Sequence, residues 1–159
     1  MKKINLIDFK TQSPIFEFKV RFFPDDYEAL YVIDEYLVFF SYETTKGGLF
    51  LSDQLEIPLA SLDFILTTIP RYDLPKSLGG LGGLDNSDET IVNGEKIFFD
   101  RVVHPHYGIE TYSITNFNRK SHINPVLNQS KEIFKETMDG GLFDKLIEIN
   151  KNYHNGVYA

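Results

Sequence analysis

In residues 15–22, apolar and charged side chains alternate without a break from Phe16 to Phe22. On one side of an extended chain lie four apolar side chains: Phe16, Phe18, Val20 and Phe22. The three charged residues between them fall on the other side. A period of two is typical of a half-buried antiparallel strand. This segment must therefore lie in a sheet with one face against a core.

Short turn signals follow this strand at close intervals. Pro24-Asp25-Asp26, Asp34-Glu35 and Lys46-Gly47-Gly48 each predict a turn. They separate further strands over residues 28–33, 36–43 and 49–51. Strands joined by such short connections predict an antiparallel meander. Beyond it, Asn93-Gly94 is a strong hairpin signal between residues 92 and 95, because both positions tolerate a positive φ; strands are expected at 96–103 and 109–117.

Helical periodicity appears once in the middle of the chain and twice near its end. Leu62, Ile65, Leu66 and Ile69 recur at helical spacing, and Pro70 is expected to end that helix. A second helix is predicted from an N-cap at Asn128 to Gly140-Gly141, with Ile133, Phe134 and Met138 on its apolar face. A third should run from Leu142 through Asn150. The sequence thus predicts one α+β domain, residues 1–159, with about three helices packed on an antiparallel sheet and two of them C-terminal.

Residues 71–89 form the one long segment without periodicity. It contains the run Gly79-Gly80-Leu81-Gly82-Gly83. The run lacks the Gly-Lys-Ser/Thr of a phosphate-binding loop and does not join a strand directly to a helix. A flexible surface loop is the expectation, and a loop of this length is usually functional or mobile.

The composition excludes several classes of protein. There is no cysteine, so disulfides and thiolate zinc sites are excluded. No stretch approaches the ~18 apolar residues of a membrane span, and Asn5 and Asp8 interrupt the start of a signal peptide. These features predict a cytoplasmic protein that does not bind membranes.

The net charge of −7 is unevenly distributed. Residues 1–100 carry a net charge of −8, and residues 101–159 a net charge of +1. An acidic surface repels phosphate backbones, which argues against a nucleic-acid partner. It would attract a basic protein and speed its encounter.

Acidic residues in the turns are the candidate partner-binding determinants, and tyrosines are the candidate aromatic anchors. The carboxylates are Asp25, Asp26, Asp34, Glu35, Asp85, Asp88 and Glu89, and the two tyrosines are Tyr27 and Tyr72.

The sequence is also compatible with two other functions. His104 and His106 are two residues apart on an extended segment, a spacing that lets two imidazoles share a metal ion in a small metal-dependent hydrolase. No signature links them to His122 or His154 as further ligands. The aromatic strands leave open a self-associating scaffold module.

The chain resembles the immunity proteins of bacterial polymorphic-toxin and contact-dependent growth inhibition systems. The resemblance lies in the order of its segments: residues 55–59 leading into a short helix, a glycine-rich loop, the hairpin at 92–95, Ile114-Thr115-Asn116 with Arg119, and the helix pair around residues 139–142. It implies a non-catalytic protein without a cofactor that occludes a cognate toxin domain, often a nuclease. It carries no individual functional residue over to this chain.

Overall fold

Two four-stranded antiparallel sheets make up most of the computed structural model, which describes residues 1–44 and 47–159. The first sheet contains, in spatial order, β1 (Phe16–Val20), β2 (Phe23–Ile33), β3 (Tyr36–Thr44) and β4 (Phe50–Pro58). The second contains β5 (Asn86–Val92), β6 (Glu95–Val103), β7 (Glu110–Lys120) and β8 (Asn128–Phe134). The predicted α+β class with antiparallel meander pairing is confirmed, and the meander occurs twice.

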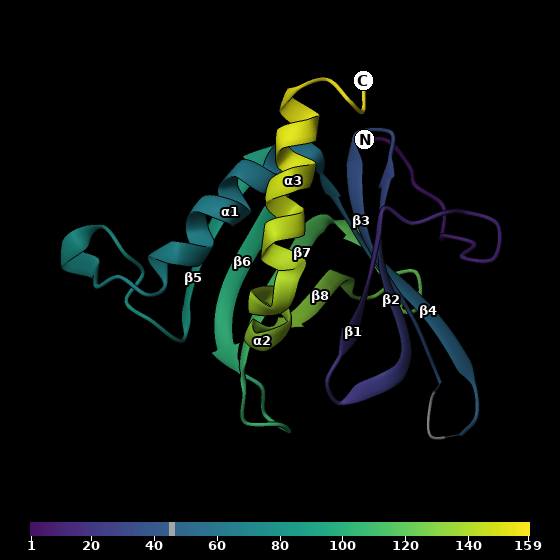
Figure 1. Cartoon of the computed structure of the whole chain (residues 1–159), viewed down its shortest axis with the longest axis horizontal. Coiled ribbons are helices and arrows are strands. Elements are labelled where there is room, and N and C mark those ends of the chain that lie inside the picture. The colour runs from purple at the N-terminus through teal and green to yellow at the C-terminus, as the bar shows by residue number, and fades with distance from the viewer. Residues whose placement is uncertain (45–46) are drawn as a thin grey trace.

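The helical part is smaller than expected. A 3-10 turn η1 (Leu59–Ser61) leads into α1 (Leu62–Arg71), and a second 3-10 turn η2 (Lys76–Leu78) precedes β5. After β8, the short α2 (Lys135–Thr137) and the π-type turn η3 (Met138–Leu142) lead into α3 (Phe143–His154). In the described residues α1 and α3 are the two substantial helices, against about three predicted. They lie side by side across the second sheet, with α3 nearer the first sheet (Figure 1). No described helix has the length and hydropathy needed to cross a membrane.

The prediction of a helix that begins at Asn128 is wrong, because residues 128–134 form β8. This segment pairs with β7 along its length, from Thr111 opposite Phe134 to Lys120 opposite Asn128. Its side chains alternate between the two faces of the sheet, with Gln129 and Ile133 buried. The helical segment starts only at Lys135.

Two predicted two-residue turns are confirmed, and one turn is misplaced. Asp34 and Glu35 have φ values of 50° and 66°, and Asn93 and Gly94 have 52° and 79°, the positive values that tight hairpins require. Residues 24–26 lie inside β2, and the turn before them is at 21–22, with Val20 opposite Phe23. The turn predicted at Lys46-Gly47-Gly48 begins outside the described residues.

The main core lies between the two sheets and the helices. It combines side chains from the inner faces of both sheets with the apolar faces of α1 and α3, for example Leu30, Phe99, Leu62 and Leu146. A second apolar cluster covers the other face of the first sheet. There Ile4 and Ile7 of the N-terminal segment pack with β2 and β3.

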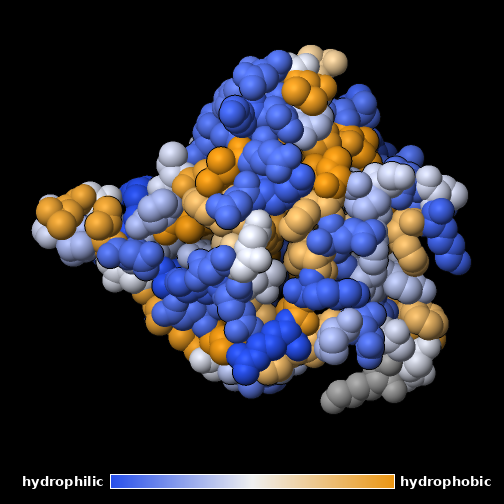
Figure 2. Space-filling model, viewed as in Figure 1, coloured by the Kyte–Doolittle hydropathy of each residue, from blue (hydrophilic) through white to orange (hydrophobic). Residues whose placement is uncertain are grey.

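The segment between α1 and β5 is shorter and better hydrogen-bonded than the predicted irregular region 71–89. Helix α1 includes Pro70 and ends at Arg71, and β5 begins at Asn86. In between, the amides of Gly80, Leu81 and Gly82 donate to the carbonyl groups of Pro75, Arg71 and Leu74 at 2.8–3.0 Å. Hydrophobic residues gather at the tip of this projecting segment (Figure 2).

Gly80 has no room for a side chain. A Cβ atom there would lie 2.0 Å from the carbonyl oxygen of Leu74. We expect Gly80→Ala to lower the free energy of unfolding by about 1–3 kcal/mol, the usual cost of overpacking. Urea denaturation measures it. Gly140→Ala is the control, because nothing lies within 4 Å of its Cβ position; equal stability of the two variants would contradict the expectation.

Candidate functional site

A cavity of about 240 Å³ opens between the first sheet and β8, and we call it the inter-sheet cavity. Its carboxylates are contributed mainly by β2, β3 and β4, and its remaining walls are largely aromatic and aliphatic. The residues that line it are Phe18, Val20, Phe23, Asp26, Glu28, Ser41, Glu43, Asp53, His104, Ile123, Ser130, Lys131, Glu132, Ile133, Phe134 and Thr137.

The cavity exists where the inner face of the first sheet changes from apolar to acidic. One row of cross-strand neighbours, which includes Leu30 and Leu55, belongs to the core. The next row along the strands reads Phe18, Glu28, Ser41 and Asp53. Successive residues on one face of a strand are two positions apart, so Asp26 and Glu43 continue this face beyond that row. Carboxylates therefore occupy positions that apolar residues fill elsewhere on the same face.

Lys131 of β8 faces these carboxylates from the second sheet. Its ammonium group lies 2.6 Å from Glu28 Oε2, and the carboxylate of Glu28 is buried. Among the described residues that line the cavity, Lys131 is the single lysine or arginine, against Asp26, Glu28, Glu43 and Asp53. Glu132, at the margin, lies 3.2 Å from His104 Nε2. The described part of the cavity thus has an excess of negative charge.

Burial raises the pKa of all four carboxyl groups above the ordinary value. Lys131 lowers each pKa in part, while repulsion among the carboxylates raises the pKa of Glu28 and Glu43 further. Oδ1 of Asp53 is buried and has no hydrogen-bond partner among the described residues. Because their pKa values are raised, these carboxyl groups hold their protons more tightly in the folded state than in the unfolded chain. The protein therefore loses stability as the pH rises through the pKa values of these groups. A further cation in the cavity would offset that loss.

A cluster of aromatic rings adjoins the cavity, and two of its members, Phe23 and Phe134, line it. Phe22 stacks on Tyr107 with ring centroids 4.4 Å apart, and Phe23 and Phe134 lie within 6.5 Å of each other. The guanidinium of Arg21 lies 4.9 Å from the centre of the Phe22 ring. These rings connect the β1–β2 turn to the segment between β6 and β7.

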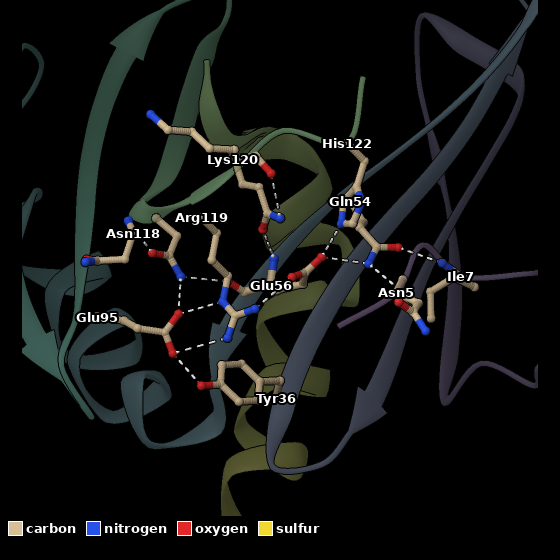
Figure 3. A network of polar contacts seen from close by, with 12 residues as sticks. Asn5, Ile7, Tyr36, Gln54, Glu56, Glu95, Asn118, Arg119, Lys120 and His122 are labelled. Carbon is tan, nitrogen blue, oxygen red and sulfur yellow. Dashed lines mark hydrogen bonds and ion pairs between the residues drawn. The ribbon is translucent and has the colours of Figure 1, made fainter. Parts of the chain in front are cut away.

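A buried ionic network, which we call the Arg119 network, joins the sheets beside the cavity (Figure 3). Arg119 Nε donates to Glu95 at 2.6 Å, and its Nη1 donates to Glu56 at 3.1 Å. Tyr36 donates to Glu95, and its ring lies 4.5 Å from the guanidinium carbon. His122 Nε2 lies 2.6 Å from Glu56 Oε2. Because these groups are almost fully paired and buried, the network is a structural link.

Side chains of the second sheet also satisfy the backbone of β4. The amide of Glu56 donates to Gln129 Oε1 at 2.9 Å, and Asn116 Nδ2 donates to the carbonyl of Glu56 at 2.9 Å. These contacts cover part of an edge strand that would otherwise present free hydrogen-bonding groups. The network therefore fixes the relative position of the two sheets that form the cavity.

The acidic residues predicted from the turns do not form one surface. Asp26 lines the cavity, and Asp25 is exposed beside it. Asp34 and Glu35 lie at the other end of β2, roughly 25 Å away for a strand of this length. The other three acidic residues belong to the second sheet: Asp85 comes just before β5, and Asp88 and Glu89 lie within it. Asp88 pairs with Arg71 at 2.8 Å, and Glu89 pairs with Lys96 at 3.2 Å.

The two predicted tyrosine anchors differ in exposure. Tyr72 is 2% exposed and its hydroxyl donates to the carbonyl of Phe99, so the prediction of Tyr72 as a surface anchor is wrong. Its ring belongs to the core because α1 turns it toward the second sheet. Tyr27 is half-buried, and its hydroxyl donates to Glu17 at 2.9 Å.

His104 and His106 lie close together without a surrounding ligand set. Their ring centroids are 5.8 Å apart, and the amide of His106 donates to His104 Nδ1 at 3.2 Å. Within residues 1–44 and 47–159, no group of three or more histidine, aspartate or glutamate side chains has a metal-binding arrangement. His104 contributes instead to the margin of the cavity, beside Glu132 and Tyr107.

Sequence reasoning missed most of the cavity. Glu28, Glu43 and Asp53 lie within strands, and Lys131 lies in a segment predicted to be helical. A usable signal was present in the alternation itself. Asp26, Glu28 and Leu30 share one face of β2, so the acidic pair interrupts an apolar face.

No family model, curated protein or solved structure matches the chain.

Proposed function

We propose that this chain is a non-catalytic protein-binding domain, and that it acts as an immunity protein that occludes a basic toxin domain at the inter-sheet cavity. The observation that carries the proposal is the set of four carboxylates that face one lysine in the described part of a surface cavity. Partly desolvated charges with too few partners favour an opposite charge from outside.

The surroundings of the carboxylates suit binding. They are held on a sheet, and the Arg119 network fixes that sheet against its neighbour. Rigid placement lowers the ordering cost of association. Exposed aromatic rings next to the cavity supply the kind of anchor that interfaces favour.

The functional test is toxin neutralisation in growing bacteria. The proposal predicts that a gene beside that of this chain encodes a C-terminal domain that stops growth. The strain expresses such a domain with or without the chain itself. We expect wild type to restore growth and Asp26→Asn/Glu43→Gln to weaken the complex at least about tenfold, as the loss of charged contacts implies. Asp34→Asn/Glu35→Gln removes two carboxylates at the far end of β2 and should restore growth like wild type.

Two outcomes would overturn the proposal. Wild-type protein that leaves growth inhibited would show that the chain does not neutralise that domain. Equal affinity of the cavity variant and its control, measured by calorimetry, would show that binding does not use the cavity. Association of the wild type should also slow as salt is raised, because screening weakens electrostatic steering.

A further inference from the structure

We infer that the inter-sheet cavity receives the guanidinium group of one arginine side chain from the partner. This inference rests on the proposed function and names the chemical group that the cavity recognises. It follows from the size of the cavity, the chemistry of its walls and the positions of its carboxylates.

The size of the cavity favours a single side chain. At about 240 Å³ it lies below the roughly 300–1,000 Å³ of pockets that enclose a drug-sized ligand. It opens at the surface, because lining residues such as Phe23, Glu43 and Ile123 are exposed. A long side chain carried by another protein can therefore reach the carboxylates while the rest of that protein stays outside.

The walls favour a guanidinium group over an ammonium group. Phe18, Phe23, Phe134 and Ile123 supply aromatic and aliphatic surface. Guanidinium is planar, more weakly hydrated than ammonium, and stacks on aromatic faces. Within this chain, Arg21 already makes such a contact with the ring of Phe22, the residue next to Phe23 of the cavity wall.

The carboxylates are placed so that one planar group with several N–H donors can hydrogen-bond to more than one of them. Glu28 and Asp53 lie in one cross-strand row with Ser41 between them, and Asp26 and Glu43 lie on the same face. Lys131 engages one oxygen of Glu28. Oδ1 of Asp53 has no hydrogen-bond partner among the described residues although it is buried. Five N–H donors in a fixed fork can contact two such carboxylates at once.

Titration with two small cations tests the inference on the intact chain. Ethylguanidinium and n-butylammonium are each added to 15N-labelled protein, and backbone amide shifts are followed by NMR. We expect ethylguanidinium to cause saturable shifts at Glu28, Ser41, Asp53 and Lys131. Its dissociation constant should rise about tenfold in Asp26→Asn/Glu43→Gln, and stay unchanged in Asp34→Asn/Glu35→Gln. The same spectra show whether each variant is folded.

The outcomes separate this inference from the proposed function. Equal binding of the two cations would overturn guanidinium recognition, and so would the absence of saturable shifts at the cavity. If toxin neutralisation still depended on Asp26 and Glu43 in that case, the proposed function would stand alone. Cavity shifts with ethylguanidinium and no neutralisation by wild type would instead support the inference and remove the proposed function.

Discussion

Replacing Arg119 with methionine is expected to lower the free energy of unfolding by about 3–5 kcal/mol. Arg119 is 5% exposed, and the carboxylates of Glu56 and Glu95 that it joins are at least as well buried. Methionine keeps much of the apolar stem but leaves two carboxylates without their cation. The desolvation cost of those charges would then be uncompensated. Urea denaturation at neutral pH measures the change.

Two further variants show whether buried charge is the cause. Arg21→Met removes an arginine from an exposed ion pair with Glu136, so it should cost less than about 1 kcal/mol. Arg119→Met/Glu56→Gln/Glu95→Gln removes the stranded charges as well and should recover much of the loss. A loss in Arg119→Met as small as that in Arg21→Met would contradict a stabilising role for the network.

Local sequence signals predicted the parts of the fold that depend on a few adjacent residues. The Asn93-Gly94 turn was found because few residue pairs adopt two successive positive φ values. Helix α1 was found because its apolar residues repeat at 3.6-residue spacing. Both structures form under rules that act within ten residues, so the sequence alone was enough.

Strand β8 escaped prediction because its inward positions are partly polar. Gln129 and Lys131 point toward the first sheet, where they contact Glu56 and Glu28. Period-two patterns are recognised by apolar residues on one face, and here only Ile133 supplies one. Pairing with β7 and contacts to another sheet decide the conformation, and neither is visible in a local window.

The cavity was missed for a related reason. Glu28, Ser41 and Asp53 are neighbours only through the register of three strands. The sequence analysis considered acidic residues as binding determinants only in turns, where solvated carboxylates are expected. No local sequence signal indicates that the first meander ends at β4. None indicates either that β8 of the second sheet places a single lysine opposite these carboxylates.

Replacing Lys131 with methionine is expected to destabilise the protein by about 2–3 kcal/mol at neutral pH, and by much less near pH 4. Lys131 is 16% exposed and Glu28 8%, so the effect should be smaller than for a fully buried pair. Without the ammonium, burial and the neighbouring carboxylates would raise the pKa of Glu28 further. Urea denaturation across this pH range gives both values.

The sign of this pH dependence follows from proton binding. A carboxyl group whose pKa is raised in the folded state binds its proton more tightly than the unfolded chain does, so stability falls as the pH rises through that pKa. Below the ordinary carboxyl pKa, Glu28 is neutral in both states and the missing lysine costs little. Lys131→Met/Glu28→Gln should therefore be more stable than Lys131→Met at neutral pH. A deficit that stayed constant with pH would instead assign the effect of Lys131 to lost packing.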